Sequence, residues 1–228
     1  MTILAIETST TVCGCAVVRD GAIVADRWID ERSAHAEKLF GLADAALRGA
    51  GVEPRDLDAV AVAIGPGSFT GLRIGLSAAK GFHLALGTPL IAVPTLTALA
   101  HRCLPLITAE GGHILAALDA RRDEAYTQTF TAGGGAVVPA GDVDARTVAD
   151  IVRTLPPGRL VITGDARQKI VAAVPGDRTI VLPDEDHARC SAGAVAQVAA
   201  VMFRRGAFAD AGTLEPMYVK EVFLRSSH

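Results

Sequence analysis

The sequence has 228 residues, half of them hydrophobic, so it can bury one large core or two smaller ones. A formal net charge of −3 excludes a global positive field that would draw the chain to nucleic acid. The four cysteines include no Cys-x-x-Cys pair and do not have the spacing of a disulfide framework. This excludes a disulfide scaffold and favours a reduced, cytoplasmic protein.

Three strands are expected at the amino end of the chain. Apolar runs at 2–6 and 13–18 are joined by a threonine-rich turn, and Asp20-Gly21 predicts a hairpin into a third strand at 22–28. Consecutive strands joined by such short turns predict an antiparallel meander.

A helix is expected next, capped by Ser33 and reaching about Arg48. Its apolar residues recur at helical spacing along one side. Two glycines, Gly49 and Gly51, are the expected stop signals, because glycine readily adopts the left-handed conformation that ends a helix.

The central stretch of the chain is a buried strand at 59–64, a Gly-Pro-Gly turn at 65–67 and a helix over 70–86. Ser68 or Thr70 can cap this helix, which a glycine then ends. Free backbone N–H groups and the positive end of the helix dipole meet at the turn, so an anion can bind there. Close packing of the helix on the strand explains the same glycines equally well, and both interpretations stay open.

The same helix carries a ridge with almost no side chain, because Gly71, Gly75 and Ala79 fall four residues apart. Another helix can approach such a ridge closely, although core packing within one subunit explains it equally well. The candidate partner surface combines the ridge with large apolar residues, namely Leu39, Phe40, Leu72 and Leu76.

A strand at 89–93 and a helix at 95–103 complete the first half in the order β-β-β-α-β-α-β-α. The longest uncharged run, 81–101, contains two prolines, so no membrane helix is expected. A meander followed by crossover units predicts a mixed sheet with helices on its faces, as in the ribonuclease-H-like architecture.

A weaker echo of this order begins at Gly112, with a strand pair at 114–119 and 124–130. The other expected elements are a loop at 133–135, helices at 145–155, 167–174 and 191–205, and strands at 160–163 and 179–182. We therefore expect a duplicated α/β protein with two lobes, residues 1–108 and residues 109–228.

Five segments together resemble the TsaB (YeaZ) family: ILAIETST, GPGSFTGLRIG, PLIAVPTLTALA, LDARRDEAY and EPMYVK. The resemblance runs nearly end to end and implies a two-lobed actin-like, Hsp70-like (ASKHA) fold in the peptidase M22-like superfamily. It also implies a role in making N6-threonylcarbamoyladenosine at tRNA position 37. In that role the chain is the non-catalytic partner of the paralogue TsaD, with the ATPase TsaE as a third component.

The paralogue's metal site rests on two histidines four residues apart, directly after a strand like PLIAV. Thr95 and Leu99 stand at the matching positions here. Neither side chain replaces an imidazole ligand, so no metal site is expected.

Actin-like ATPases cradle phosphates with an Asp-x-Gly turn in each lobe. The first turn here keeps a carboxylate and hydroxyls, whereas two arginines follow the acidic residue of the second and either crowd the turn or grip an anion. We expect no cofactor and no ATP hydrolysis by this chain alone. The candidate remnant of an anion or nucleotide site comprises Glu7, Thr8, Ser9, Thr10, Gly65, Gly67, Ser68, Thr70 and Asp119.

No catalytic residue is expected, because Ser68 lacks a nucleophile-elbow sequence and suits a helix cap better. The leading hypothesis is a scaffold that binds TsaD through the candidate partner surface, or a second copy of itself through the same surface. The resemblance and the net charge imply that tRNA is reached only through another subunit. The alternative is an actin-like-fold enzyme, either a phosphotransferase (ATPase) or an M22-type peptidase.

Overall fold

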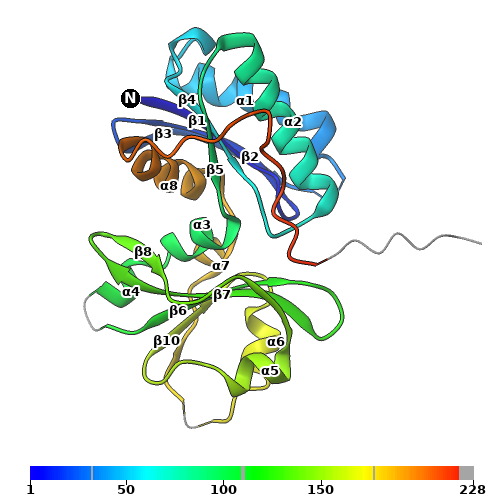
Figure 1. Cartoon of the computed structure of the whole chain (residues 1–228), viewed down its shortest axis with the longest axis vertical. Coiled ribbons are helices and arrows are strands. Elements are labelled where there is room, and N and C mark those ends of the chain that lie inside the picture. The colour runs from blue at the N-terminus through cyan, green and yellow to red at the C-terminus, as the bar shows by residue number, and fades with distance from the viewer. Residues whose placement is uncertain (32, 109–110, 177, 221–228) are drawn as a thin grey trace, which may run out of the picture.

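The computed structural model describes residues 1–31, 33–108, 111–176 and 178–220, which form two lobes stacked along the long axis (Figure 1). Each lobe is built around one mixed β-sheet with helices packed on it. The predicted α/β architecture, with a duplicated pair of mixed sheets as in actin-like proteins, is confirmed.

The first lobe holds a five-stranded sheet in the order β3-β2-β1-β4-β5. Its strands are β1 (Thr2–Glu7), β2 (Val12–Arg19), β3 (Ala22–Asp30), β4 (Ala59–Ala63) and β5 (Leu90–Val93). β1, β2 and β3 form the expected antiparallel meander, whereas β4 runs parallel to β1 and β5 parallel to β4. Every residue of β4 is buried, which its uncharged AVAVA sequence permits because both faces of the sheet are covered.

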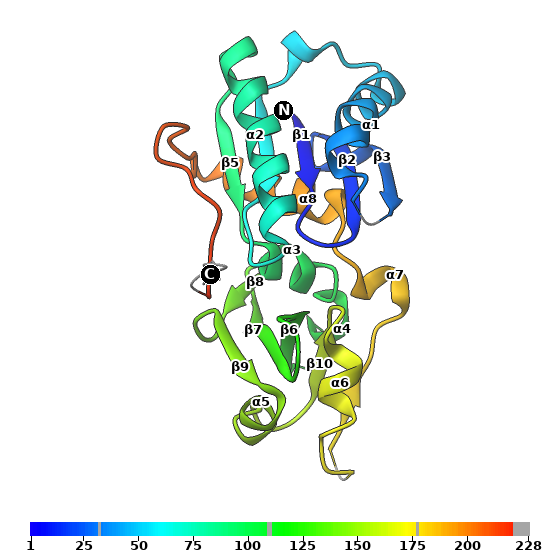
Figure 2. The ribbon, with the colours of Figure 1, turned by 90° about the vertical axis from the view of Figure 1, so that its right-hand side faces the viewer.

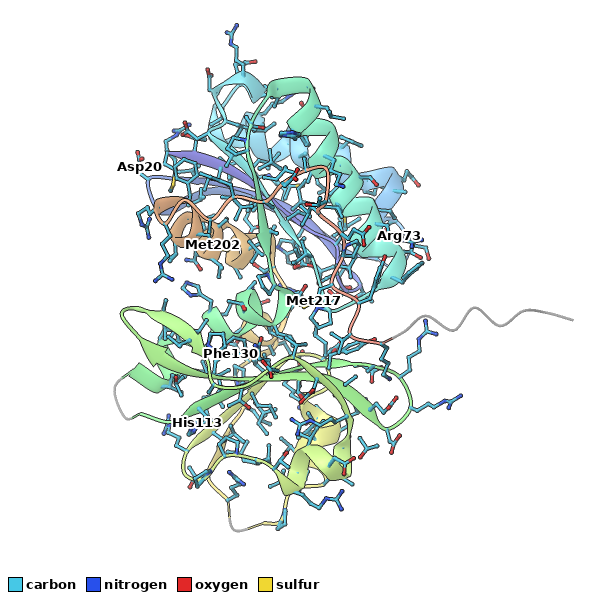
Figure 3. All side chains as sticks on the ribbon, in the orientation of Figure 1. Asp20, Arg73, His113, Phe130, Met202 and Met217 are labelled. Carbon is cyan, nitrogen blue, oxygen red and sulfur yellow. The ribbon has the colours of Figure 1, made fainter. Side chains whose placement is uncertain are left out.

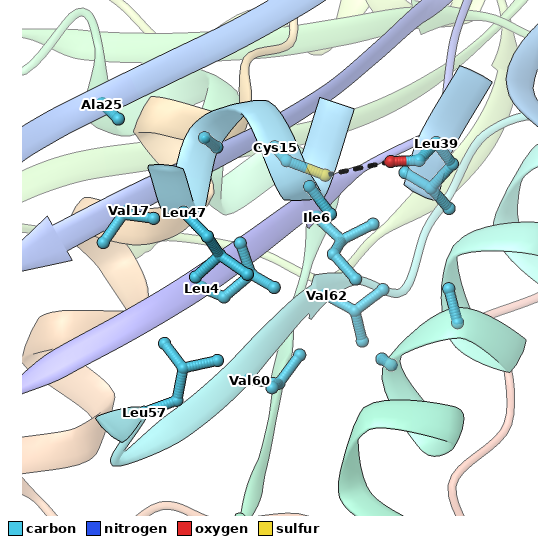
Figure 4. Close-up of a cluster of buried hydrophobic side chains, with 14 of the residues drawn as sticks. Leu4, Ile6, Cys15, Val17, Ala25, Leu39, Leu47, Leu57, Val60 and Val62 are labelled. Atoms are coloured by element: carbon cyan, nitrogen blue, oxygen red, sulfur yellow. Dashed lines mark hydrogen bonds between the residues drawn. The ribbon is translucent and has the colours of Figure 1, made fainter. Parts of the chain in front are cut away.

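Helices cover both faces of this sheet (Figure 2). α1 (His35–Ala50) and α2 (Phe69–Leu86) pack on one face, and α8 (Ala192–Arg204) packs on the other. Figure 4 shows part of the core under α1 and α2, where Leu4 and Ile6 of β1 lie with Leu39 of α1. Burial of this apolar area, at roughly 25 cal/mol per Å², is the main stabilising contribution.

The start of α1 differs from the prediction. Ser33 has a left-handed φ of 66°, and Ala34 is the N-cap residue without a side-chain hydrogen bond. A capping serine needs extended backbone just before the first turn, so the predicted Ser33 cap is wrong. Gly49 lies within the helix, whereas Gly51, with a φ of 60°, forms the left-handed C-cap.

The second lobe repeats the plan of the first, since β6 pairs antiparallel with β7 and parallel with β10, as β1 does with β2 and β4. The sheet has the order β11-β10-β6-β7-β8, and β9 also pairs with β7. Its strands are β6 (His113–Asp119), β7 (Glu124–Gly133), β8 (Ala136–Pro139), β9 (Asp144–Thr147), β10 (Leu160–Thr163) and β11 (Ile180–Val181). Its helices are α5 (Val148–Arg153), α6 (Arg167–Val171) and α7 (Glu185–Ala188).

One prediction for the second lobe is wrong in detail, and one hairpin was not predicted. Residues 145–147, expected as the start of a helix, belong to β9, because pairing with β7 overrides their local preference. The Thr147 side chain then caps α5 by accepting a hydrogen bond from the Asp150 backbone N–H. The predicted loop at 133–135 is present as a turn: Gly133 ends β7, and Gly134 and Gly135 turn the chain into β8, a hairpin that was not predicted.

The chain passes between the lobes at α3, returns before α8, and passes again at 218–220, where Tyr218 binds Arg73 and Lys220 binds the Ala120 carbonyl. α3 (Thr95–His101) lies between the two sheets and contributes Leu96 and Leu99 to the core of the second lobe, and the short α4 (Pro105–Thr108) follows it. Within the first lobe, a 3₁₀ turn, η1 (Pro54–Asp56), lies between α1 and β4. α8 packs against the first sheet, although the predicted boundary assigned residues 109–228 to the second lobe.

Candidate functional site

The predicted anion-site segments of the first lobe meet at the carboxyl end of β1. The Thr8 hydroxyl donates a 2.8 Å hydrogen bond to the Gly71 carbonyl, and the Ser68 backbone N–H donates a 2.7 Å bond to the Ser9 carbonyl. The turn after β1 and the first turns of α2 therefore form one hydrogen-bonded unit.

Three glycines face this turn so closely that no side chain fits. A Cβ on Gly67 would lie 2.3 Å from the Ser9 carbonyl oxygen, and one on Gly71 would lie 2.0 Å from the Thr8 carbonyl oxygen. One on Gly75 would lie 2.2 Å from the Thr8 hydroxyl oxygen. Close packing within the subunit accounts for the glycine spacing, and an anion role for these residues stays a prediction.

The start of α2 bears out the capping prediction. The Ser68 hydroxyl accepts a 3.2 Å hydrogen bond from the Gly71 backbone N–H, while Thr70 lies exposed on the outer face. Gly65 has a φ of 116°, and a Cβ there would lie 2.7 Å from the Met217 carbonyl oxygen, so only glycine suits this position.

Glu7 ends β1 with its carboxyl group fully buried. Burial raises the pKa of Glu7 to about 7, although hydrogen bonds from the Ser9 backbone N–H and hydroxyl to Oε1 act in the opposite direction. Oε2 has no hydrogen-bond partner among the described residues. Near neutral pH this group is poised between its acid and its carboxylate.

The corresponding turn of the second lobe keeps its acidic residue paired. Asp119 forms an ion pair with Lys169, and its backbone N–H donates a 2.7 Å hydrogen bond to Asp165. Arg121 and Arg122 follow with left-handed φ angles of 70° and 53° and point their exposed side chains to solvent. The arginines therefore do not crowd the turn, so the first of the two predicted outcomes is wrong, and anion binding by them stays a prediction.

The two positions that match the paralogue's metal ligands serve the core. The Thr95 hydroxyl accepts a 3.1 Å hydrogen bond from the Gly65 backbone N–H, and Leu99 is buried in the core of the second lobe. Within the described ranges, no three His, Cys, Asp or Glu side chains are grouped closely enough to hold a metal ion.

The candidate partner surface needs correction. The ridge Gly71, Gly75 and Ala79 faces the interior, and so do Leu72 and Leu76. Leu39 is also buried but lines the groove described below, and Phe40, 60% exposed, projects outward. The periodicity correctly indicated a packed face, but the packing partner is the subunit's own sheet and its Thr8 turn.

A groove lies instead between the outer faces of α1 and α2, with a volume of about 520 Å³. It is lined by Ala36, Leu39, Phe40, Phe69, Thr70, Arg73, Ile74, Ser77 and Ala78. Sequence reasoning missed Phe69 and Arg73, which lie one turn apart on α2. The signal that was available is Arg73 itself, the sole arginine in an otherwise almost uncharged helix.

The segment after α8 contacts two residues that line this groove, Phe69 and Arg73. Tyr218 stacks on Phe69 with 5.1 Å between ring centroids, and its hydroxyl accepts a 2.9 Å hydrogen bond from Arg73 Nε. The Arg73 guanidinium also lies 3.8 Å from the centre of the Phe69 ring. Figure 3 shows Arg73 on the outer side of α2 and Met217 on the segment that descends beside it.

No helix within the described residues is long and apolar enough to cross a membrane.

Comparison with known proteins gives one family. The family model for "TsaD: tRNA N6-adenosine threonylcarbamoyltransferase" matches residues 30–202. An uncharacterized Mycobacterium tuberculosis protein is 39% identical over 149 residues, covering 63% of this chain and 67% of that protein. The Escherichia coli tRNA threonylcarbamoyladenosine biosynthesis protein TsaB is 37% identical over 126 residues, or 55% of this chain and 53% of that protein.

One solved structure extends the likeness to almost the whole chain. YeaZ from Pseudomonas aeruginosa superposes with a TM-score of 0.82 at 28% sequence identity, covering 95% of this chain and 99% of YeaZ. The sequence alignment with E. coli TsaB spans about half of that relative's length, whereas the structural likeness includes both lobes.

Proposed function

Since the chain belongs to the TsaB (YeaZ) family, we propose that it is a non-catalytic subunit in the synthesis of threonylcarbamoyladenosine in tRNA. Its partner in this proposal is a TsaD-type catalytic paralogue. Relatives named for this biosynthesis support the pathway, and the match to the TsaD family model supports a paralogous partner.

The observation that carries the proposal is the groove between α1 and α2. It combines the exposed Phe40 with Phe69 and the cation of Arg73, and aromatic side chains and arginine are the residues enriched at energetically important interface positions. A helix of the partner laid into this groove would bury Phe40 and surround Arg73 with protein.

The non-catalytic character is supported by the two turns that face nucleotide in actin-like enzymes. In the first turn, Thr8 and Ser9 pack closely against the glycines at the start of α2. In the second turn, the acidic residue Asp119 forms an ion pair with Lys169. Thr95 and Leu99, at the paralogue's metal positions, are core residues.

Two further partners and a cellular location belong to the same proposal. TsaE joins the assembled complex, the site of action is the cytoplasm, and without TsaD a second copy of the chain occupies the same groove. A two-fold homodimer and the TsaD complex would then compete for one surface.

The test is reconstitution. The TsaD paralogue, TsaE and substrates are combined with and without this chain, and threonylcarbamoyladenosine in tRNA is quantified. We expect co-purification with TsaD and formation of the modified base only when the chain is present. Modification at an equal rate without the chain would reject the proposal, and ATP or peptide hydrolysis by the chain alone would favour the enzyme alternative.

A further inference from the structure

The turn between β6 and β7 presents two neighbouring arginines in an unusual backbone conformation. Arg121 and Arg122 have φ angles of 70° and 53°, a region that residues with a side chain rarely adopt in succession. The backbone bonds that close the turn run from Ala120 N–H to Glu124 O at 3.1 Å and from Glu124 N–H to Arg121 O at 3.2 Å. The tight hairpin holds both side chains outward.

The acidic residues at the base of the turn are already neutralised. Asp119 is paired with Lys169, and Glu124 is paired with Lys220. Lys220 also donates a 3.2 Å hydrogen bond to the Ala120 carbonyl. Asp123 is the one acid left beside the two arginines within the turn, so the tip carries a net positive charge on a chain whose total is −3.

Neither arginine has a partner of its own in the part of the chain that the structure describes. No ion pair, side-chain hydrogen bond or ring contact involves Arg121 or Arg122, and both are exposed. By contrast, Arg73, Arg167 and Arg189 each hold an aromatic ring or a carboxylate. A rigid turn that presents two unpaired guanidinium groups suits a ligand with several negative oxygens.

The segment after α8 links the turn to Arg73, which lines the α1–α2 groove. Tyr218 binds Arg73 at the groove, and Lys220 binds the Ala120 carbonyl at the turn. The Cα atoms of residues 218 and 220 are at most about 7 Å apart, so this segment and its two side chains tie the turn to α2. In Figure 1 this segment, coloured red, descends from the first lobe to the second.

We propose that Arg121 and Arg122 contact the phosphate backbone of tRNA when the chain is bound to its catalytic partner. This inference rests on the proposed function, which makes tRNA the polyanion on which the assembled complex acts. It differs from the expectation that tRNA is reached only through another subunit. That expectation came from the family resemblance and from the net charge, which is summed over the whole chain and gives no information on a local pair of arginines.

The test is the double substitution Arg121→Asn with Arg122→Asn. Asparagine tolerates the left-handed backbone better than most residues, so the charge is removed while the turn is retained. The matched control is Arg204→Asn with Arg205→Asn, two consecutive exposed arginines at the end of α8 on the first lobe. Affinity for TsaD and affinity of the assembled complex for tRNA are measured separately, the second over a salt series.

We expect TsaD affinity to be unchanged and tRNA binding to weaken about two- to fivefold per arginine at physiological salt. The slope of log affinity against log salt should become less steep by about one per arginine lost. In the modification assay KM for tRNA should rise at constant kcat, and the α8 control should match the wild type in every measurement.

Unchanged tRNA affinity and salt slope in a complex that assembles and works normally would overturn the RNA contact and leave the proposed function standing. Loss of TsaD affinity in the turn variant would also overturn it, because the arginines would then face an acidic protein surface. Failure of the wild-type chain to bind TsaD would reject both inferences.

Discussion

The Thr8 hydroxyl donates a 2.8 Å hydrogen bond to the Gly71 carbonyl, and a Cβ on Gly71 would lie 2.0 Å from the Thr8 carbonyl oxygen. This contact ties the end of β1 to the first turn of α2. It explains why the small-residue ridge of α2 belongs to the interior, while the opposite face of the helix lines the α1–α2 groove.

Gly71→Ala should destabilise the fold by about 1–3 kcal/mol or more, because the added methyl group meets backbone that cannot rotate aside. Gly81→Ala is the matched control in the same helix, where a Cβ meets nothing within 4 Å. That change should stabilise by about 0.5–1 kcal/mol, since alanine is the better helix former. Chemical unfolding of both variants measures the difference, and equal effects would show that the Thr8 contact is not tight.

Glu7 should make stability fall as pH rises. Its folded pKa of about 7 exceeds the ordinary value of 4.5, so between these two values the folded state binds more protons than the unfolded state. The contribution of Glu7 to the free energy of unfolding is fully present below pH 4.5 and is lost as the pH rises through 7. At 1.36 kcal/mol per pKa unit, the free energy of unfolding falls by about 3 kcal/mol over this range.

Glu7→Gln should remove that part of the pH dependence and raise stability at pH 8, since the amide keeps an acceptor for Ser9 and carries no buried charge. Unfolding free energies of both proteins from pH 5 to pH 8 provide the measurement. Parallel curves for the two proteins would mean that Glu7 keeps an ordinary pKa.

Tyr218 should fasten the segment after α8 to α2. Tyr218→Ala removes the stacking on Phe69 and the bond from Arg73, whereas Tyr218→Phe removes only the bond. An aromatic pair contributes about 0.5–1.5 kcal/mol beyond its buried area, so local opening should increase by roughly two- to tenfold. Hydrogen exchange of the Met217 amide, which donates a 2.7 Å bond to the Ile64 carbonyl, reports this opening.

The expected order is Tyr218→Ala fastest, then Tyr218→Phe, then wild type. If the Met217 amide exchanges at the same rate in all three proteins, Tyr218 does not anchor the segment.

Local sequence signals predicted the elements whose cause is local. The Asp20-Gly21 hairpin, the Ser68 cap and the Gly51 stop each depend on one or two residues that favour one backbone conformation. β9 was missed because four residues, Asp144–Thr147, become a strand only through pairing with β7. Tertiary pairing of this kind has no signature in the segment itself.

The features of the candidate site also divide into those that local sequence signals predict and those that depend on long-range contacts. Periodicity showed that one face of α2 is packed, but it carried no information on what packs there, so Gly75 was assigned to a partner surface although it faces Thr8. Phe69 and Tyr218 lie far apart in sequence, and only the path of the chain after α8 brings them together. Long-range contacts of this kind are set by topology, not by spacing.

The central claim is that the α1–α2 groove binds the TsaD paralogue. The most direct measurement is the dissociation constant of the complex for Phe40→Asp, with Leu84→Asp as the control. Phe40 and Leu84 are both exposed apolar residues, 60% and 83%, but Leu84 lies outside the groove. A buried aromatic anchor typically contributes 2 kcal/mol or more, so Phe40→Asp should weaken binding by about thirtyfold or more, and Leu84→Asp should leave it unchanged. Equal affinities for wild type and Phe40→Asp, with both proteins folded, would contradict the account.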